Sequence, residues 1–304
     1  MAGMTRPALL LALLLASSAG AEQRRLLYEG HSPYTPVYVS EDAKGLRYLQ
    51  FERNGALQSV VRPGAPRQLE LAYARGAMTA LAFVPAPKRV LVVGLGGGSM
   101  PMFLRSLYPA AHIDVVDIDP EVVKVARRFF GLKEDPRLRV HVADGRRFIE
   151  ASARSHEGGY ELVFLDAYGP DSIPFHLATQ EFLAGVRRSL APGGLVVSNV
   201  WAAPNPLYGA MLRTYQAQFP RVQLLELGGS ANRIVFSQVS KAGPPRDALV
   251  RQGTALSRKH SLSFDLGQLL ARGLRELTPA DVGTAAVLRD ADAPEAPAPA
   301  REAR

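Results

Sequence analysis

From Arg89 onward, short apolar runs alternate along the chain with segments whose apolar residues recur at helical spacing. Nearly continuous apolar runs are typical of strands buried on both faces of a parallel sheet, and the intervening spacing is typical of covering helices. The pattern therefore predicts an α/β fold in which ligands bind at the carboxyl ends of the strands. Strands are expected at 89–93, 112–117, 138–142, 161–166 and 194–200, and helices at 99–107, 121–130, 147–153, 179–190 and 206–219.

The predicted sheet ends in a different way from its parallel centre. Two further apolar runs, at 222–227 and 233–237, are joined by a glycine-rich link that is too short for a parallel crossover. They are therefore expected to form an antiparallel hairpin. A Rossmann-like parallel sheet that ends in such a hairpin is the plan of the S-adenosylmethionine-dependent methyltransferases and their relatives.

The rest of the chain divides into segments of different composition. Residues 32–62 are expected to form β structure with a hairpin at Asn54-Gly55, and helical spacing marks 69–83 and 245–287. The end of the chain is rich in alanine, proline and glutamate, which is typical of disorder. The expected segments are a signal peptide at 1–21, a small N-terminal β-hairpin domain at 22–66, a Rossmann-like domain at 67–240, a C-terminal helical extension at 241–287 and a disordered tail at 288–304.

The first residues have the pattern of a secretory signal peptide. Arg6 precedes an apolar run at 7–16, and a small-residue cleavage pattern follows at Ala19-Gly20-Ala21. The run is shorter than the ~20 residues that span a bilayer, and no other segment is long and apolar enough to do so. The sequence thus predicts a protein exported to the periplasm or secreted, with a mature chain that starts at Glu22 and has no membrane span.

Composition excludes several kinds of site. The 304 residues include no cysteine, so disulfides, thiolate catalysis and cysteine metal sites are excluded. The six histidines show neither HxH nor HExxH spacing, so no metal site is expected. The formal charge of +8 comes from scattered arginines, without a long basic run or interleaved aromatic residues. Nucleic-acid binding is therefore not expected.

A glycine cluster follows the first expected strand and precedes a helix. Glycine lets the backbone turn tightly and approach a ligand where a Cβ would clash. Ser99 stands at the third position of the dinucleotide fingerprint, so the cluster lacks a good pyrophosphate signature. The candidate nucleoside-binding glycines of this loop are Gly94, Gly96, Gly97 and Gly98.

Acidic residues follow the next two expected strands. Asp117 and Asp119 come about 20 residues after the glycine cluster, where an acid can accept hydrogen bonds from two ribose hydroxyls. Asp144 and Gly145 follow the third strand, where an acid can accept from an exocyclic amine such as adenine N6. A ribose acid and an adenine acid without a pyrophosphate signature favour an adenosyl sulfonium over NAD.

Several runs together carry a family resemblance: Val90–Gly98, Val116–Pro120, Ala143–Gly145, Leu165–Pro174 and Ile173–Phe182. They resemble the polyamine aminopropyltransferases, the spermidine synthase family, and in particular its divergent bacterial spermidine-synthase-like branch. The resemblance covers about residues 33–240.

This resemblance implies roles for three acids. Asp117 would hold the ribose, Asp144 the adenine, and Asp166 would be the catalytic acid at the end of the fourth strand. Asp171, in the loop that follows, is a further candidate anchor for the acceptor amine, apart from the resemblance. A free alkylamine has a pKa of ~10 and arrives protonated, so a carboxylate can bind the ammonium and then accept its proton. The implied co-substrate is S-adenosylmethionine or its decarboxylated form, the acceptor an amine or another small nucleophile, and the assembly a homodimer.

Two positions depart from the family pattern. Gly97 stands where spermidine synthases carry an acid that contacts the amine of the decarboxylated donor, and Gly169 stands at the second acid of a pattern that begins at Asp166. Loss of the loop acid removes a charge that repels the carboxylate of S-adenosylmethionine, and leaves room for backbone N–H groups to meet it. Three functions stay open: a spermidine-synthase-like transferase, an S-adenosylmethionine-dependent methyltransferase, and an exported non-catalytic binding protein.

Overall fold

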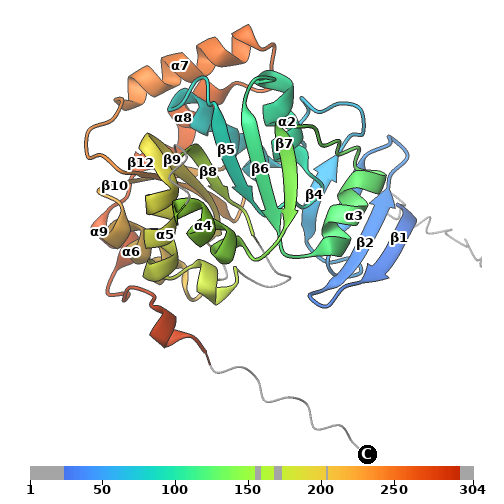
Figure 1. The fold of residues 1–304 in the computed structure, drawn as a ribbon. Helices are drawn as coiled ribbons and strands as arrows, with labels where there is room; N and C mark the ends of the chain where they lie inside the picture. Colours follow the sequence, from blue (N-terminus) through green and yellow to red (C-terminus); the bar gives the residue numbers. More distant parts are fainter. Residues whose placement is uncertain (1–23, 155–158, 168–172, 203–204, 295–304) are drawn as a thin grey trace, which may run out of the picture.

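The computed structural model describes residues 24–154, 159–167, 173–202 and 205–294 (Figure 1). The predicted signal peptide, the candidate anchor Asp171 and Gly169 lie outside these ranges, so the predictions made for them stay predictions. Among the described helices, none is long and apolar enough to cross a membrane.

The large sheet has eight strands in the order β12-β10-β11-β9-β8-β5-β6-β7. Pairing is parallel from β9 through β8, β5 and β6 to β7, and antiparallel among β9, β11, β10 and β12. The predicted parallel sheet with a closing antiparallel hairpin is thus confirmed. The strands are β5 Arg89–Val93, β6 His112–Asp117, β7 Leu138–Val142, β8 Tyr160–Leu165, β9 Leu190–Trp201, β10 Arg221–Glu226, β11 Asn232–Gln238 and β12 Leu274–Glu276.

Helices bury both faces of this sheet, as the continuous apolar runs require. Along β5, Val90 and Val92 join one core cluster, while Leu91 and Val93 join the other. Successive side chains of a strand point to opposite faces, so each face has its own core. The helices are α1 Ala72–Ala77, α2 Ser99–Leu107, α3 Pro120–Phe129, α4 Gly145–Arg154, α5 Gln180–Ser189, α6 Tyr208–Gln218, α7 Arg246–Lys259, α8 Leu266–Gly273 and α9 Pro279–Val282, with 3₁₀ turns η1 Met78–Ala82, η2 Phe175–Leu177 and η3 Asp290–Asp292.

A four-stranded antiparallel sheet precedes the Rossmann-like part and lies beside α3 (Figure 1). The hairpin predicted at Asn54-Gly55 joins β3 to β4, and Asn54 adopts a positive φ of 63° there. The guanidinium of Arg47 donates to the Phe129 carbonyl at the end of α3 and ties the two parts together. The strands are β1 Arg25–His31, β2 Pro36–Glu41, β3 Arg47–Gln50 and β4 Leu57–Val61.

Three expectations need correction. The helix expected at 69–83 is a short α1 followed by the 3₁₀ turn η1. The C-terminal segment 245–287, expected to be helical, contains the edge strand β12. The packed chain also extends past the predicted start of the tail. Leu288 is buried, and its backbone N–H donates to the Thr214 hydroxyl over 2.9 Å. Two further contacts hold this part: the Gln180 backbone N–H donates to the Leu288 carbonyl, and Arg146 forms an ion pair with Asp290.

Candidate functional site

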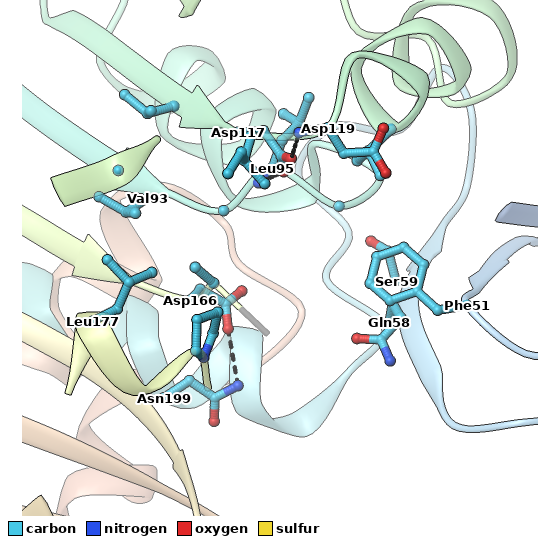
Figure 2. A pocket seen from close by; sticks show the side chains of 18 of the residues that line it. Phe51, Gln58, Ser59, Val93, Leu95, Asp117, Asp119, Asp166, Leu177 and Asn199 are labelled. Carbon is cyan, nitrogen blue, oxygen red and sulfur yellow. Dashed lines mark hydrogen bonds between the residues drawn. The ribbon is translucent and has the colours of Figure 1, made fainter. Parts of the chain in front are cut away.

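A cavity of about 530 Å³ opens at the carboxyl ends of the central parallel strands. Its walls come from the β5–α2 loop, the ends of β6, β8 and β9, and the β4 region of the N-terminal sheet (Figure 2). The predicted acids Asp117, Asp144 and Asp166 all line it, although 49 positions separate the first from the last. The site therefore lies where an open α/β sheet binds its ligands.

The glycine loop between β5 and α2 has the geometry that glycine permits. Gly94 and Gly96 line the cavity with φ of 99° and 52°. A Cβ at Gly94 would lie 2.3 Å from the Asp166 carbonyl oxygen, so only glycine allows β5 to approach β8 this closely. Gly98, with φ of 75°, is the N-cap residue of α2.

Asp117 ends β6 and underpins the glycine loop. Its two carboxylate oxygens accept hydrogen bonds from the backbone N–H groups of Leu95, over 2.8 Å, and Asp119, over 2.9 Å. A backbone hydrogen bond from Gly96 adds to these two, and of the roughly four lone-pair sites of a carboxylate one stays for a ligand hydroxyl. Burial raises the pKa of Asp117 to about 6. The prediction that it holds a ribose is compatible with this position at the cavity wall.

Asp119 lines the cavity, but its oxygens already have protein partners. One accepts from the Glu121 backbone N–H over 2.8 Å and caps α3, and the other accepts from the Ser32 hydroxyl over 2.5 Å. Because residues 34 and 35 also line the cavity, this contact holds the N-terminal wall in place. Its role as a nucleoside ligand stays a prediction.

Asp144 follows β7, and Gly145 begins α4. One Asp144 oxygen accepts from the Arg147 backbone N–H, and the other lies 2.9 Å from Nε2 of His176 on η2. Partial burial alone would raise the pKa of Asp144, but the bonds from Arg147 and His176 outweigh it and lower the pKa. A Cβ at Gly145 would lie 2.6 Å from the Val93 side chain, so this glycine allows α4 to start against β5.

Asp166 follows β8, is partly buried and lines the cavity (Figure 2). Burial raises its pKa to about 7, and hydrogen bonds from Asn199 and Tyr73 oppose that rise. The Asn199 amide donates to Oδ1 of Asp166 over 2.9 Å. A carboxyl group with a pKa near neutrality can bind and release a proton under physiological conditions, which is what a general base requires.

Gly97 and Gly98 are not among the residues that line the cavity, and their role in cofactor binding stays a prediction. A Cβ at Gly97 would lie 2.9 Å from both the Phe130 ring and the Ser59 hydroxyl. The side-chain space that the family's loop acid occupies is thus filled here by Ser59 of β4 and by Phe130, which is completely buried. The absent acid does not leave an open space behind it.

This packing predicts a stability effect. Gly97→Ala is expected to lower the free energy of unfolding by about 1–3 kcal/mol, since overpacking moves buried neighbours. Gly228→Ala is the matched control, because nothing lies within 4 Å of a Cβ there. Urea unfolding measures both. A Gly97→Asp variant with wild-type stability would contradict this account and show that the loop has room for an acid.

The sequence analysis missed Asn199 and Asn232 as site residues. Both line the cavity, and Asn232 donates from its amide to Oδ1 of Asn199 over 2.9 Å. The available signal was a polar pair, Ser198-Asn199, at the end of the otherwise apolar run expected to form a buried strand. Within the described ranges, no group of three histidine, aspartate or glutamate residues is arranged to hold a metal ion.

Comparisons with known proteins agree with this geometry. The profile of the spermine/spermidine synthase domain matches residues 77–212. The polyamine aminopropyltransferase of Vibrio vulnificus is 32% identical over 253 residues, which cover 82% of this chain and 83% of that protein. The chain belongs to the polyamine aminopropyltransferase family. The resemblance found in the motifs is thereby confirmed.

Two further relatives are methyltransferases. The human eEF1A lysine and N-terminal methyltransferase is 34% identical over 161 residues, which are 50% of this chain but only 23% of that protein. The crystal structure of human methyltransferase-like protein 13 in complex with SAH superposes with a TM-score of 0.58 at 30% identity, covering 62% of this chain and 91% of that one. Aminopropyltransferases and methyltransferases thus share the fold and motifs of this chain.

Proposed function

We propose that this protein transfers an alkyl group from an adenosyl sulfonium to an amine, and that the group is aminopropyl. The observation that supports it best is the position of Asp166, a partly buried carboxyl group that lines the same cavity as Asp117 and Asp144, the predicted nucleoside acids. Membership of the aminopropyltransferase family, along 82% of the chain, supports the same activity.

The cavity offers separate places for the two parts of the donor. Asp117 beside the glycine loop would accept from a ribose hydroxyl, and Asp144 at the end of β7 would accept from the adenine amine. His176 now holds one Asp144 oxygen, over 2.9 Å, so adenine would share or replace that contact. The sulfonium would then lie between the glycine loop and Asp166, with the reacting carbon facing the carboxylate.

The transfer is a displacement at carbon. The amine nitrogen attacks the carbon beside the sulfonium, the new C–N bond forms, and the C–S bond breaks with its electron pair returning to sulfur. The attacking nitrogen loses one proton, which Asp166 accepts. Aminopropyl transfer leaves methylthioadenosine, and the same step with a methyl group leaves S-adenosylhomocysteine. The protein contributes binding, orientation and the base.

The raised pKa of Asp166 predicts how the rate depends on pH. Below a pKa of about 7 the carboxyl is protonated and cannot accept a proton from the amine, so kcat/KM should rise as pH increases through about 7. Steady-state rates between pH 5 and pH 9 at fixed ionic strength measure this limb. A profile that is flat across neutrality would contradict the role of Asp166 as base.

Methylation is the second candidate function. It is favoured by Gly97, since the loop lacks the acid that contacts the amine of the decarboxylated donor in spermidine synthases, and by the 34% identity to the human amine methyltransferase. Calorimetric titration with S-adenosylmethionine, its decarboxylated form and methylthioadenosine tests the proposal. Tighter binding of the decarboxylated donor supports aminopropyl transfer, tighter binding of S-adenosylmethionine supports methylation, and binding of none contradicts both.

A further inference from the structure

A chain of side-chain amides leads from the β11 edge of the cavity to Asp166. Asn232, the first residue of β11, donates from Nδ2 to Oδ1 of Asn199 over 2.9 Å, and Asn199 on β9 donates from Nδ2 to Oδ1 of Asp166 over 2.9 Å. Strands β9 and β11 are antiparallel neighbours, with Asn199 opposite Ile234. The two asparagines are therefore diagonal cross-strand neighbours on the face of the sheet that meets the cavity.

The chemistry of these groups fixes the direction of every hydrogen bond. An ionised carboxylate only accepts, so Asn199 must present its NH₂ to Asp166. The carbonyl of Asn199 then faces Asn232, which must present its own NH₂. The hydroxyl of Ser230 completes the chain by lying 3.2 Å from Oδ1 of Asn232. While Asp166 is ionised, flipping the side-chain amide of Asn199 or Asn232, so that its oxygen and NH₂ exchange places, would lose at least one hydrogen bond.

We propose that Asn232 is a positioning residue for amine alkylation, which acts through the Asn199 amide to orient the Asp166 carboxylate and keep it in its charged form. This inference rests on the proposed function. The chain holds Oδ1 of Asp166. The donated hydrogen bond also favours the ionised form, against the burial that disfavours it.

Other titratable groups face the same space and enter the interpretation of any pH effect. Tyr73 also hydrogen-bonds with Asp166 and favours its charged form. The side chain of Asn232 forms hydrogen bonds with Asn199 and Ser230, so a substitution at Asn232 reaches Asp166 through Asn199. The titratable side chains that line the cavity with Asp166 are Tyr34, Tyr73, Asp117, Asp119, Asp144 and His176.

The most decisive variant reverses the direction of the hydrogen bonds in this chain of amides. In Asn232→Asp the new carboxylate only accepts, so Asn199 turns its NH₂ toward position 232 and its carbonyl toward Asp166. Asp166 then keeps this bond only as the protonated acid, and its titration midpoint should rise by about one pH unit or more. Asn232→Ala, which removes the partner without reversing the bond, should give a smaller rise. Asn205→Ala is the matched control, because the Asn205 amide donates to the Trp201 carbonyl and takes no part in the chain of amides that leads to Asp166.

Two measurements separate this inference from the proposed function. Carboxyl ¹³C NMR of aspartate-labelled protein, with the Asp166 signal assigned by its loss in Asp166→Asn, follows the titration without any turnover. Identical midpoints in the wild type, Asn232→Asp and Asn232→Ala would overturn the inference. In the kcat/KM profile, Asn232→Asp should be about tenfold slower at pH 6, about fivefold slower at pH 7, and approach the wild type at higher pH. If the wild type transfers no group to any amine, the proposed function fails while the NMR result still decides the role of Asn232.

Discussion

Asp166→Asn is expected to lower the rate of alkyl transfer by roughly 10²–10⁴-fold, the contribution typical of a positioned general base. Asparagine has nearly the same shape and can still accept from Asn199 through its carbonyl, so the surrounding chain of amides should persist. What is lost is the group that accepts the proton of the amine. Donor affinity should change little, since Asp117 and Asp144 form the expected nucleoside contacts.

Single-turnover rates at saturating donor and amine, together with calorimetric donor binding, measure the two effects separately. Asp247→Asn on α7 makes the same chemical change at an exposed position and should retain full activity. A rate for Asp166→Asn within a few-fold of the wild type would contradict the assignment of Asp166 as base. Loss of donor binding in this variant would place the carboxylate in the donor site instead.

Asp117→Ala is expected to weaken binding of every adenosyl ligand by about ten- to a hundred-fold, which corresponds to charge-assisted hydrogen bonds worth ~1.5–3 kcal/mol. The carboxylate also accepts from the backbone N–H groups of Leu95 and Asp119, so its loss should loosen the glycine loop. Asp117→Asn retains one acceptor for these groups. It should therefore keep more of the loop order while losing the charge that binds hydroxyls.

Calorimetry with methylthioadenosine, which lacks the charged sulfonium and the aliphatic amine or carboxylate of the donors, isolates this nucleoside subsite. The exposed Asp247→Ala serves as control. Burial raises the pKa of Asp117 to about 6 in the ligand-free protein. Protonation of Asp117 should therefore weaken ribose binding as pH falls below 6. Unchanged affinity in both Asp117 variants would exclude this acid as the ribose ligand.

The parts of the site that follow from strand order could be predicted from the sequence. Parallel strands end at one edge of a sheet, so Asp117, Asp144 and Asp166 had to meet there once the strands were recognised. The sequence analysis did not assign Asp119 as a helix cap, although an acid directly before Pro120 and Glu121 is a common start of a helix.

The remaining features depend on contacts between distant segments. Ser59 contacts the space behind Gly97 only because the N-terminal sheet packs onto the Rossmann-like domain. Asn199 and Asn232 meet because β11 returns antiparallel to β9, and the register of that pairing decides which side chains become neighbours. A strand of three residues such as β12 carries too short a pattern to be distinguished from a helix.

The central claim is that the protein catalyses alkyl transfer from an adenosyl sulfonium to an amine, and the co-product tests it most directly. The wild type and Asp166→Asn are incubated with decarboxylated or ordinary S-adenosylmethionine and a panel of amines, and the nucleosides are separated by mass spectrometry. We expect the wild type to form methylthioadenosine from the decarboxylated donor in equal amount to an aminopropylated amine, and Asp166→Asn to form it far more slowly. S-Adenosylhomocysteine with a methylated amine would establish the second candidate function instead. Formation of neither co-product by the wild type would contradict the account and leave a binding protein of the same fold.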